Sequence, residues 1–267
     1  MSKHRGQFVF WLESFMQLFL PLFVYFLFHA AVQVIVSSLL GMEFYMNHST
    51  AVQCVGNAVL LPVFFRMYRG KQSHPESEQK AEKRSLSAGD CLKIIGVSVC
   101  FSRGVNLLIG LTPLPGWFPA YESASASVMR EAFWIQLLAV VVFAPVAEEL
   151  LMRGLIYGRL KSMTGNIKLA ILASSLLFAL FHGNIVQGIY AFALGALFAW
   201  LMERCKTLWA PVLAHAAANA VTLALSLPQL SEGLSRHPVV TILLTAVFLL
   251  AGYFLAKRIE DSGKESS

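Results

Sequence analysis

The chain has 267 residues, of which 57% are hydrophobic and only 13% are charged, whereas a soluble domain carries about a quarter charged residues. The apolar residues come in long runs rather than on one face of a helix or strand, which excludes an ordinary water-soluble core and indicates contact with lipid. The net charge of +6 does not indicate a nucleic-acid partner, because the basic residues form short clusters between apolar runs, as orientation in a bilayer requires.

Successive apolar segments are each close to the roughly 20 residues that a helix needs to cross the hydrocarbon. Alternating β patterns are absent, so we predict an all-α polytopic membrane bundle of about eight transmembrane helices. A large buried core of a soluble helical protein is the alternative that this pattern disfavours. The predicted spans are 15–40, 50–67, 89–111, 132–153, 167–184, 186–203, 208–227 and 238–257, the fourth continuing as helix through Arg159.

Lysine and arginine gather in the connectors after the second, fourth, sixth and eighth predicted spans. This alternation predicts that both termini are cytoplasmic. We expect one integral membrane domain: residues 1–131 hold three helices with a cytoplasmic linker at 68–88, residues 132–257 hold five more, and residues 258–267 form a cytoplasmic tail. The expected location is the cell membrane, with a bacterial plasma membrane favoured, and the expected surroundings are the lipid bilayer.

The fourth span carries the first polar motif, Glu148-Glu149 followed by Arg153. Ionisable groups inside a bilayer are costly and therefore indicate partners or a function. Glu149 and Arg153 are four residues apart on one helix face, so they can form an ion pair. Glu148 lies about 100° around the helix and can point elsewhere, which gives the two carboxylates different environments. By itself, the Glu149–Arg153 pair favours a structural or membrane-interface role over a catalytic one.

The fifth and seventh spans carry two further motifs with four-residue spacing. In the fifth, Phe178 precedes His182, so the phenyl ring is expected to pack beside the imidazole. In the seventh, His215 and Asn219 share a face and enclose three alanines, which permit close helix approach. Each histidine alone could be a hydrogen-bonded packing residue, and His215 with Asn219 could join two helices. Together with the two acids and the arginine, they indicate a functional site.

These three patterns, in this order, resemble the EExxxR, FxxxH and HxxxN motifs of the CAAX-protease and bacteriocin-processing (CPBP, or Abi) family of membrane endopeptidases. The resemblance covers about residues 133–227. It implies an eight-helix bundle that hydrolyses peptide bonds of membrane-embedded, membrane-associated or lipidated substrates. It also implies that Glu148 is the general base, that His182 helps to hold the water, and that His215 and Asn219 stabilise the oxyanion. Glu149, Arg153 and Phe178 would support these four residues.

The involvement of a metal is left open by the sequence. Zinc or another divalent ion could be held by Glu148, Glu149, His182 and His215, which are all acceptable ligand types. The HExxH spacing that places two ligands and a base on one helix is absent. We therefore favour glutamate-dependent hydrolysis without a cofactor over a metalloprotease.

Two other function classes fit the same residues. A non-proteolytic scaffold or bacteriocin-immunity protein could use this fold, and a transporter could use the buried acids as a proton relay.

The catalytic interpretation has one geometric problem, the depth of His182 in the membrane. Counting 1.5 Å per residue puts His182 about 10 Å nearer the outer face than Glu148 and His215. We therefore predict that the fifth helix is tilted or begins deeper, and that residues 182–184 form a short hairpin inside the bundle.

Overall fold

The computed structural model describes residues 2–72, 85–225 and 237–264. Within these ranges the elements are all helices, and no strand occurs. The prediction of an all-α polytopic bundle is confirmed.

Five long helices and two shorter ones correspond to seven of the predicted spans. They are α1 (Ser2–Leu40), α3 (Ser49–Gln72), α4 (Ala88–Gly110), α10 (Ile167–Phe181), α11 (Ile185–Cys205), α12 (Trp209–Leu225) and α14 (Pro238–Lys264). The eighth span is a continuous helical segment built from α7 (Phe133–Gln136), η1 (Leu137–Phe143), α8 (Ala144–Glu149), η2 (Leu150–Tyr157) and α9 (Gly158–Thr164). Three short helices that the sequence did not predict occupy connectors: α2 (Met42–Asn47), α5 (Leu114–Trp117) and α6 (Pro119–Met129).

Among the described residues, six helices are long and apolar enough to cross a membrane, and α10 and α12 are shorter apolar helices. With 15 and 17 residues, these two reach only about 23 and 26 Å at 1.5 Å per residue, less than the roughly 30 Å of hydrocarbon. Two of the three polar motifs lie on these short helices, the C-cap residue His182 of α10 included, whereas the acidic motif lies on the long segment 133–164.

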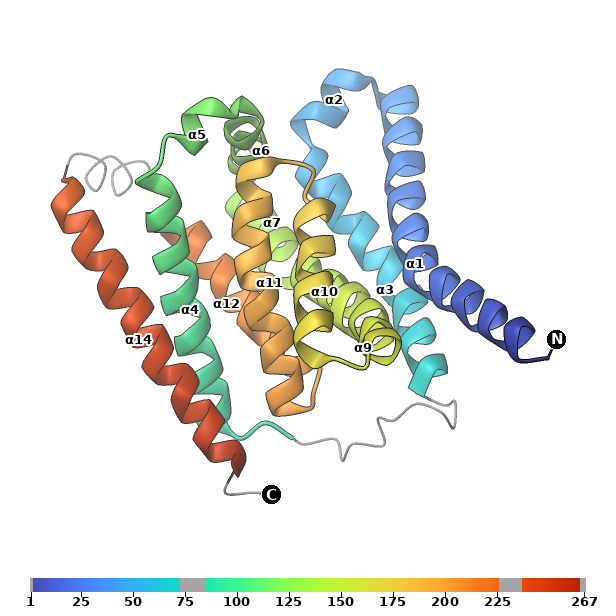
Figure 1. Ribbon diagram of the computed structural model, residues 1–267. Coiled ribbons are helices and arrows are strands. Elements are labelled where there is room, and N and C mark those ends of the chain that lie inside the picture. Colours follow the sequence, from blue (N-terminus) through green and yellow to red (C-terminus); the bar gives the residue numbers. More distant parts are fainter. Residues whose placement is uncertain (1, 73–84, 226–236, 265–267) are drawn as a thin grey trace.

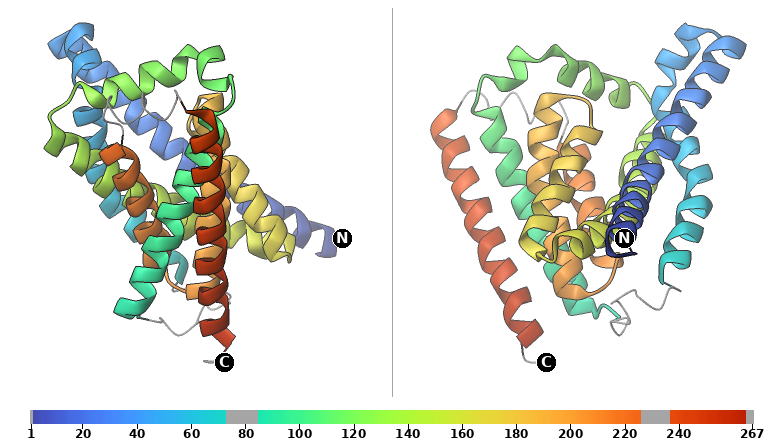
Figure 2. Two further views of the ribbon diagram at one scale, coloured as in Figure 1. Left: turned by 90° about the vertical axis from the view of Figure 1, so that its left-hand side faces the viewer. Right: turned by 45° about the vertical axis from the view of Figure 1, so that its right-hand side comes forward.

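The helices surround a central pair, α11 and α12, as Figure 1 shows. Helices α4 and α14 pack along each other on one side, and α4 also packs on α12. Helices α1 and α3 form the opposite side, and the segment 133–164 crosses obliquely between them and α12 (Figure 2). Short helices α5 and α6 lie across the end of the bundle that is opposite the C-terminal end of α14 (Figure 1). The N-terminal end of α1 points outward at the side of the bundle, at about the height of α9.

The helical segment 133–164 changes its hydrogen-bonding pattern on both sides of the glutamates. The wider π-helical pattern of η1 and η2 flanks the short α8, which contains Pro145, Glu148 and Glu149. Proline has no N–H to donate and so interrupts a regular helical ladder, and π-helical turns inside α-helices are frequent at functional sites. The acidic motif thus lies in an irregular part of an otherwise continuous helix.

Helix α10 ends earlier than predicted, at Phe181 rather than residue 184. Gly183 has a left-handed backbone with φ of 68°, and Asn184 caps the next helix by accepting a hydrogen bond from the Gln187 N–H. Glycine adopts this conformation readily, and asparagine is a favoured helix cap. The turn predicted at residues 182–184 is therefore present, but Gly183 is exposed and His182 and Asn184 are only partly buried, so the prediction that this hairpin is buried inside the bundle is wrong.

Parts of the predicted linker at 68–88 and of the predicted tail at 258–267 are helical in the described residues. Helix α3 continues to Gln72 and α4 begins at Ala88, while the central linker residues 73–84 lie outside the described part. Helix α14 continues to Lys264, so the predicted tail is helical there, and residues 265–267 also lie outside the described part. A capping box at the start of α4, formed by Ser87 and Asp90, ends the linker.

Candidate active site

Glu149 and Arg153 form the ion pair that their spacing predicts. The distance from Arg153 Nη1 to Glu149 Oε1 is 3.0 Å, and neither side chain is exposed. The π-helical turn between them does not prevent the contact. A buried pair of this kind is costly to form, but it is much more costly to leave one member without the other.

Three further contacts hold the Arg153 guanidinium in place. Its Nη2 donates to the carbonyl oxygen of Gly195 at 2.8 Å, and its Cζ lies 4.7 Å from the Phe178 ring centroid and 5.5 Å from that of Phe198. A Cβ at Gly195 would lie 3.2 Å from Nη2, so the absence of a side chain there permits the close approach. Aromatic faces attract a cation, and the guanidinium is therefore enclosed by α10 and α11.

His215 is held by the second hydrogen bond to the same Glu149 oxygen. Its Nδ1 lies 2.9 Å from Glu149 Oε1, and its ring stacks on Phe198 with centroids 4.9 Å apart. Because Glu149 also accepts from Arg153, its oxygen is an acceptor and Nδ1 is the donor. A hydrogen bond at one imidazole nitrogen fixes the role of the other, so Nε2 is left to face the cavity.

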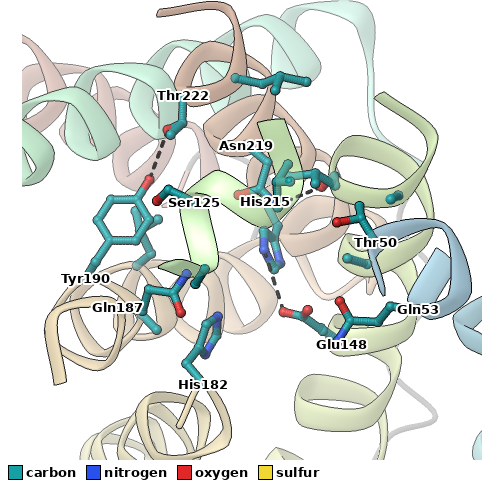
Figure 3. A pocket seen from close by; sticks show the side chains of 18 of the residues that line it. Thr50, Gln53, Ser125, Glu148, His182, Gln187, Tyr190, His215, Asn219 and Thr222 are labelled. Carbon is teal, nitrogen blue, oxygen red and sulfur yellow. Dashed lines mark hydrogen bonds and ion pairs between the residues drawn. The ribbon is translucent and has the colours of Figure 1, made fainter. Parts of the chain in front are cut away.

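Glu148 lies on the other side of His215 and faces open space. Its Oε2 is 3.9 Å from His215 Nε2, and Figure 3 shows both side chains pointing into one pocket. The cavity has a volume of about 410 Å³, and Glu148, His182, His215 and Asn219 all line it, while Glu149 and Arg153 do not. The two adjacent carboxylates thus have the separate environments that their angular offset predicts.

His182 reaches this cavity from the hairpin after α10. Its Nδ1 lies 2.8 Å from the Phe178 carbonyl oxygen, so Nδ1 donates there and Nε2 is free to act in the cavity. The Phe178 ring meets the His182 ring edge-to-face with centroids 4.8 Å apart, and the His215 ring at 5.8 Å. One phenyl ring therefore contacts both imidazoles, and His182 lines the same cavity as Glu148 and His215 despite the depth difference calculated from residue counts.

Asn219 lies one helical turn beyond His215 on α12. Its Nδ2 donates to the carbonyl oxygen of Val140 at 2.8 Å, which belongs to the π-helical η1. An amide nitrogen carries two N–H groups, so one remains for a ligand after this bond is made.

The side chains do not converge as a metal site. Among the described residues, no group of three or more His, Cys, Asp or Glu side chains is placed to hold a metal ion. Glu149 Oε1 already accepts from Arg153 and His215, and Glu149 does not line the cavity. The four residues that the sequence allowed as ligands therefore do not fit a shared metal in this arrangement.

The cavity also contains polar residues that the sequence motifs did not single out. They include Gln53 and Asn57 from α3, Asn106 from α4, Gln187 and Tyr190 from α11, and Thr222 from α12. Polar groups inside apolar spans were the available signal, since each is costly in lipid. Their spacing forms no short motif, and only the packing of four helices brings them together.

Comparison with known proteins bears on the same part of the chain. Residues 130–221 match the family model described as "Type II CAAX prenyl endopeptidase Rce1-like". This range includes all three polar motifs. The matched segment is thus similar to a family of CAAX endopeptidases, which is the class that the three motifs resemble. It holds Glu148, His182, His215 and Asn219, whereas the polar residues contributed by α3 and α4 lie before it.

A curated relative supports the same assignment. The Bacillus subtilis (strain 168) protein named "Putative membrane peptidase YdiL" is 28% identical to this chain over 107 residues. The match covers 40% of this chain and 43% of the relative, so the alignment spans less than half of either protein. No solved structure gives a significant match.

Proposed function

We propose that this protein is an intramembrane endopeptidase that hydrolyses peptide bonds of membrane-associated or lipidated substrates. The observation that carries the proposal is the convergence of Glu148, His182, His215 and Asn219 on one cavity inside a membrane bundle. The match of residues 130–221 to a CAAX prenyl endopeptidase family model supports the same class of reaction.

Glu148 is the general base in this mechanism. It lines the cavity, and Arg153 is paired with Glu149 instead, so the Glu148 carboxylate can take a proton from water. His182 Nε2 positions that water, since its Nδ1 is engaged by the Phe178 carbonyl. The hydroxide attacks the carbonyl carbon of the scissile bond, and Glu148 then returns the proton to the leaving amine.

His215 and Asn219 stabilise the oxyanion formed by this attack. Asn219 has one N–H left after its bond to Val140. His215, held at Nδ1 by Glu149, donates from Nε2 when its ring is protonated. Donors held in place before the reaction do not reorganise during it, and one such donor contributes about 3–4 kcal/mol to catalysis.

Hydrolysis by this arrangement requires no metal ion. The proposal therefore predicts that activity of the purified protein in proteoliposomes is unchanged by a strong chelator and is not increased by added zinc. Loss of activity with the chelator and recovery with zinc would show that the reaction uses a metal.

The decisive experiment compares wild type with Glu148→Gln and His182→Ala. The probe is a peptide with an S-farnesylated cysteine followed by three apolar residues, reconstituted in proteoliposomes. We expect wild type to cleave it and Glu148→Gln to lose at least about a thousandfold of kcat/KM, because the base is removed without a change of size. The matched controls are Glu43→Gln and His237→Ala, whose residues are exposed and lie outside the cavity.

The same variants separate the alternative functions. A scaffold or immunity protein would leave the peptide intact with every variant, and a proton-coupled transporter would respond to Glu148→Gln in proton flux but not in cleavage. If the farnesylated peptide is not cleaved, mass spectrometry can compare the membrane peptides of a deletion strain with those of its parent. This comparison tests whether the protein is a protease without assuming a substrate.

We also infer that the end of the bundle at which α3 and α14 finish faces the cytoplasm of a bacterial cell, and that both termini are cytoplasmic. The basic residues at the ends of α3, α9, α11 and α14 support this orientation. Single cysteines at exposed Lys257 and exposed Met42, introduced into a variant without native cysteines, test it. Only Met42→Cys should react with a membrane-impermeant thiol reagent in intact cells, and the reverse result would contradict the orientation.

A further inference from the structure

The catalytic cavity extends beyond the four proposed catalytic residues to a second polar cluster. Asn106, Tyr190 and Thr222 line the same cavity as Glu148 and His215. Figure 3 shows Tyr190 and Thr222 on the side of the cavity away from Glu148. His215, Asn219 and Thr222 occur at intervals of four and three residues on α12, so they share one face of that helix.

The hydrogen bonds of this cluster fix the orientation of one side-chain amide. Thr222 Oγ1 donates to the Ala218 carbonyl at 2.8 Å, so it acts as an acceptor toward its other neighbours. Asn106 Nδ2 donates to it at 3.3 Å, and the Tyr190 hydroxyl lies 3.4 Å from it. Tyr190 is therefore the donor in its contact. The threonine oxygen thereby sets which end of the Asn106 amide faces it.

Asn106 retains unused hydrogen-bonding capacity toward the cavity. Its amide nitrogen donates to Thr222, so the acceptor oxygen Oδ1 lies on the other branch of the amide group. An amide carbonyl oxygen of this kind complements the N–H of a peptide group. A substrate backbone inside a membrane protein needs such partners, because its own N–H and C=O groups cannot bond to lipid.

The neighbouring wall is apolar. Ile109 and Val186 line the cavity near this cluster together with Leu223, and Val105, Ile109 and Val186 form a small buried apolar cluster of their own. A ligand at this end therefore meets one backbone-like amide and a hydrophobic surface, which suits a peptide residue with an apolar side chain.

We propose that Asn106, oriented by Thr222 and Tyr190, forms a substrate subsite that binds the backbone N–H of an apolar residue about three positions from the scissile bond. This inference rests on the proposed peptidase function. Seven residues separate His215 from Thr222, which is about 10 Å along α12. An extended peptide advances about 3.3 Å per residue, so the subsite is about three residues from the carbonyl under attack.

The test replaces single backbone N–H groups of the substrate by ester oxygen. The probe is the farnesylated peptide described above, lengthened at both ends by apolar residues, with one ester at each position in turn. We expect an ester two or three residues from the scissile bond to lower kcat/KM of the wild type about fivefold, mainly through KM, since one hydrogen bond is lost. Asn106→Leu should have the same loss with the all-amide peptide and no further loss with that ester.

A second variant keeps the test decisive if Asn106→Leu does not fold. Thr222→Val preserves shape but removes the oxygen that orients Asn106, so kcat/KM should fall about threefold and the response to the critical ester should shrink. Thr245→Val is the matched control, because Thr245 is also buried and its hydroxyl donates to the Thr241 carbonyl on α14, outside the cavity.

The possible failures are distinguishable. Cleavage of all ester peptides at similar rates by wild type, or equal ester effects in wild type and Asn106→Leu, would overturn the subsite and leave the peptidase proposal intact. Failure of wild type to cleave the all-amide peptide would instead contradict the proposed function for lipidated peptides, and the subsite with it.

Discussion

Removing Arg153 tests whether the buried ion pair is essential to the architecture of the site. In Arg153→Met the side chain stays long and apolar, but Glu149 loses the guanidinium at 3.0 Å and remains fully buried. Leaving one partner of a buried ion pair without the other costs about 3–5 kcal/mol. The variant also loses the bond to the Gly195 carbonyl and the contacts with two phenyl rings. We therefore expect a loss of about 4 kcal/mol, a large part of the roughly 5–15 kcal/mol of a typical domain.

The double variant Glu149→Gln/Arg153→Met separates the charge from the packing. It removes both charges, and the amide introduced at position 149 keeps a carbonyl oxygen that can still accept the His215 N–H. The free energy of unfolding, measured by denaturant titration in mixed micelles, should recover by at least about 2 kcal/mol relative to Arg153→Met. The single variant Glu149→Gln completes a double-mutant cycle, and the four free energies of unfolding together give the coupling between the two side chains.

Two results would refute this reasoning. A cost below about 1 kcal/mol for Arg153→Met would mean that Glu149 is neutral or solvated in the native state. A double variant no more stable than Arg153→Met would mean that lost packing, rather than uncompensated charge, accounts for the effect. Glu43→Gln, at an exposed position, provides the baseline for removal of a carboxylate.

Three further substitutions have defined outcomes. Gly195→Ala places a methyl group 3.2 Å from Arg153 Nη2, so it should lower both the melting temperature in detergent and the peptidase activity. A variant with the melting temperature and activity of wild type would contradict the close packing. Asn219→Leu removes an oxyanion donor and should reduce kcat by several hundredfold with KM little changed, so a pure KM effect would argue against that role. Gly56→Ala places a methyl group 2.6 Å from His29 Cε1 and should destabilise by about 1–3 kcal/mol, with His29→Ala in the same chain restoring part of the loss. If Gly56→Ala and Gly56→Ala/His29→Ala are equally stable, the clash with His29 is not the cause of the destabilisation.

The sequence predicted the helices well because a membrane allows few alternatives. Residues in hydrocarbon must satisfy their backbone groups within the helix, so a long apolar run specifies a helix with little ambiguity. The motif spacings were informative for the same reason: residues four apart on a helix are neighbours, and the pairs Glu149–Arg153 and Phe178–His182 are in contact as expected. The connectors were predicted less well, since helices α2, α5 and α6 depend on local packing at the end of the bundle.

The relation between the motifs could not be obtained from local spacing. Counting residues gave His182 a depth about 10 Å from Glu148, because it assumed that every apolar run crosses the whole bilayer. Helix α10 is instead short, the chain turns at Gly183 and Asn184, and His182 lines the same cavity as Glu148. The bond between His215 and Glu149 is likewise a long-range contact, and it assigns Glu149 a direct part in orienting an imidazole as well as pairing with Arg153.

By itself, then, the sequence determined that the protein is a helical membrane bundle, and it identified which buried polar residues require an explanation. These properties follow from short-range physics, namely the hydrogen bonds within a helix and the cost of charge in lipid. The tertiary structure decided which carboxylate is paired and which faces the cavity, and it brought Asn106 from α4 to the same cavity as His215. Such relations depend on how helices from distant parts of the chain pack together, and no local pattern of residues encodes them.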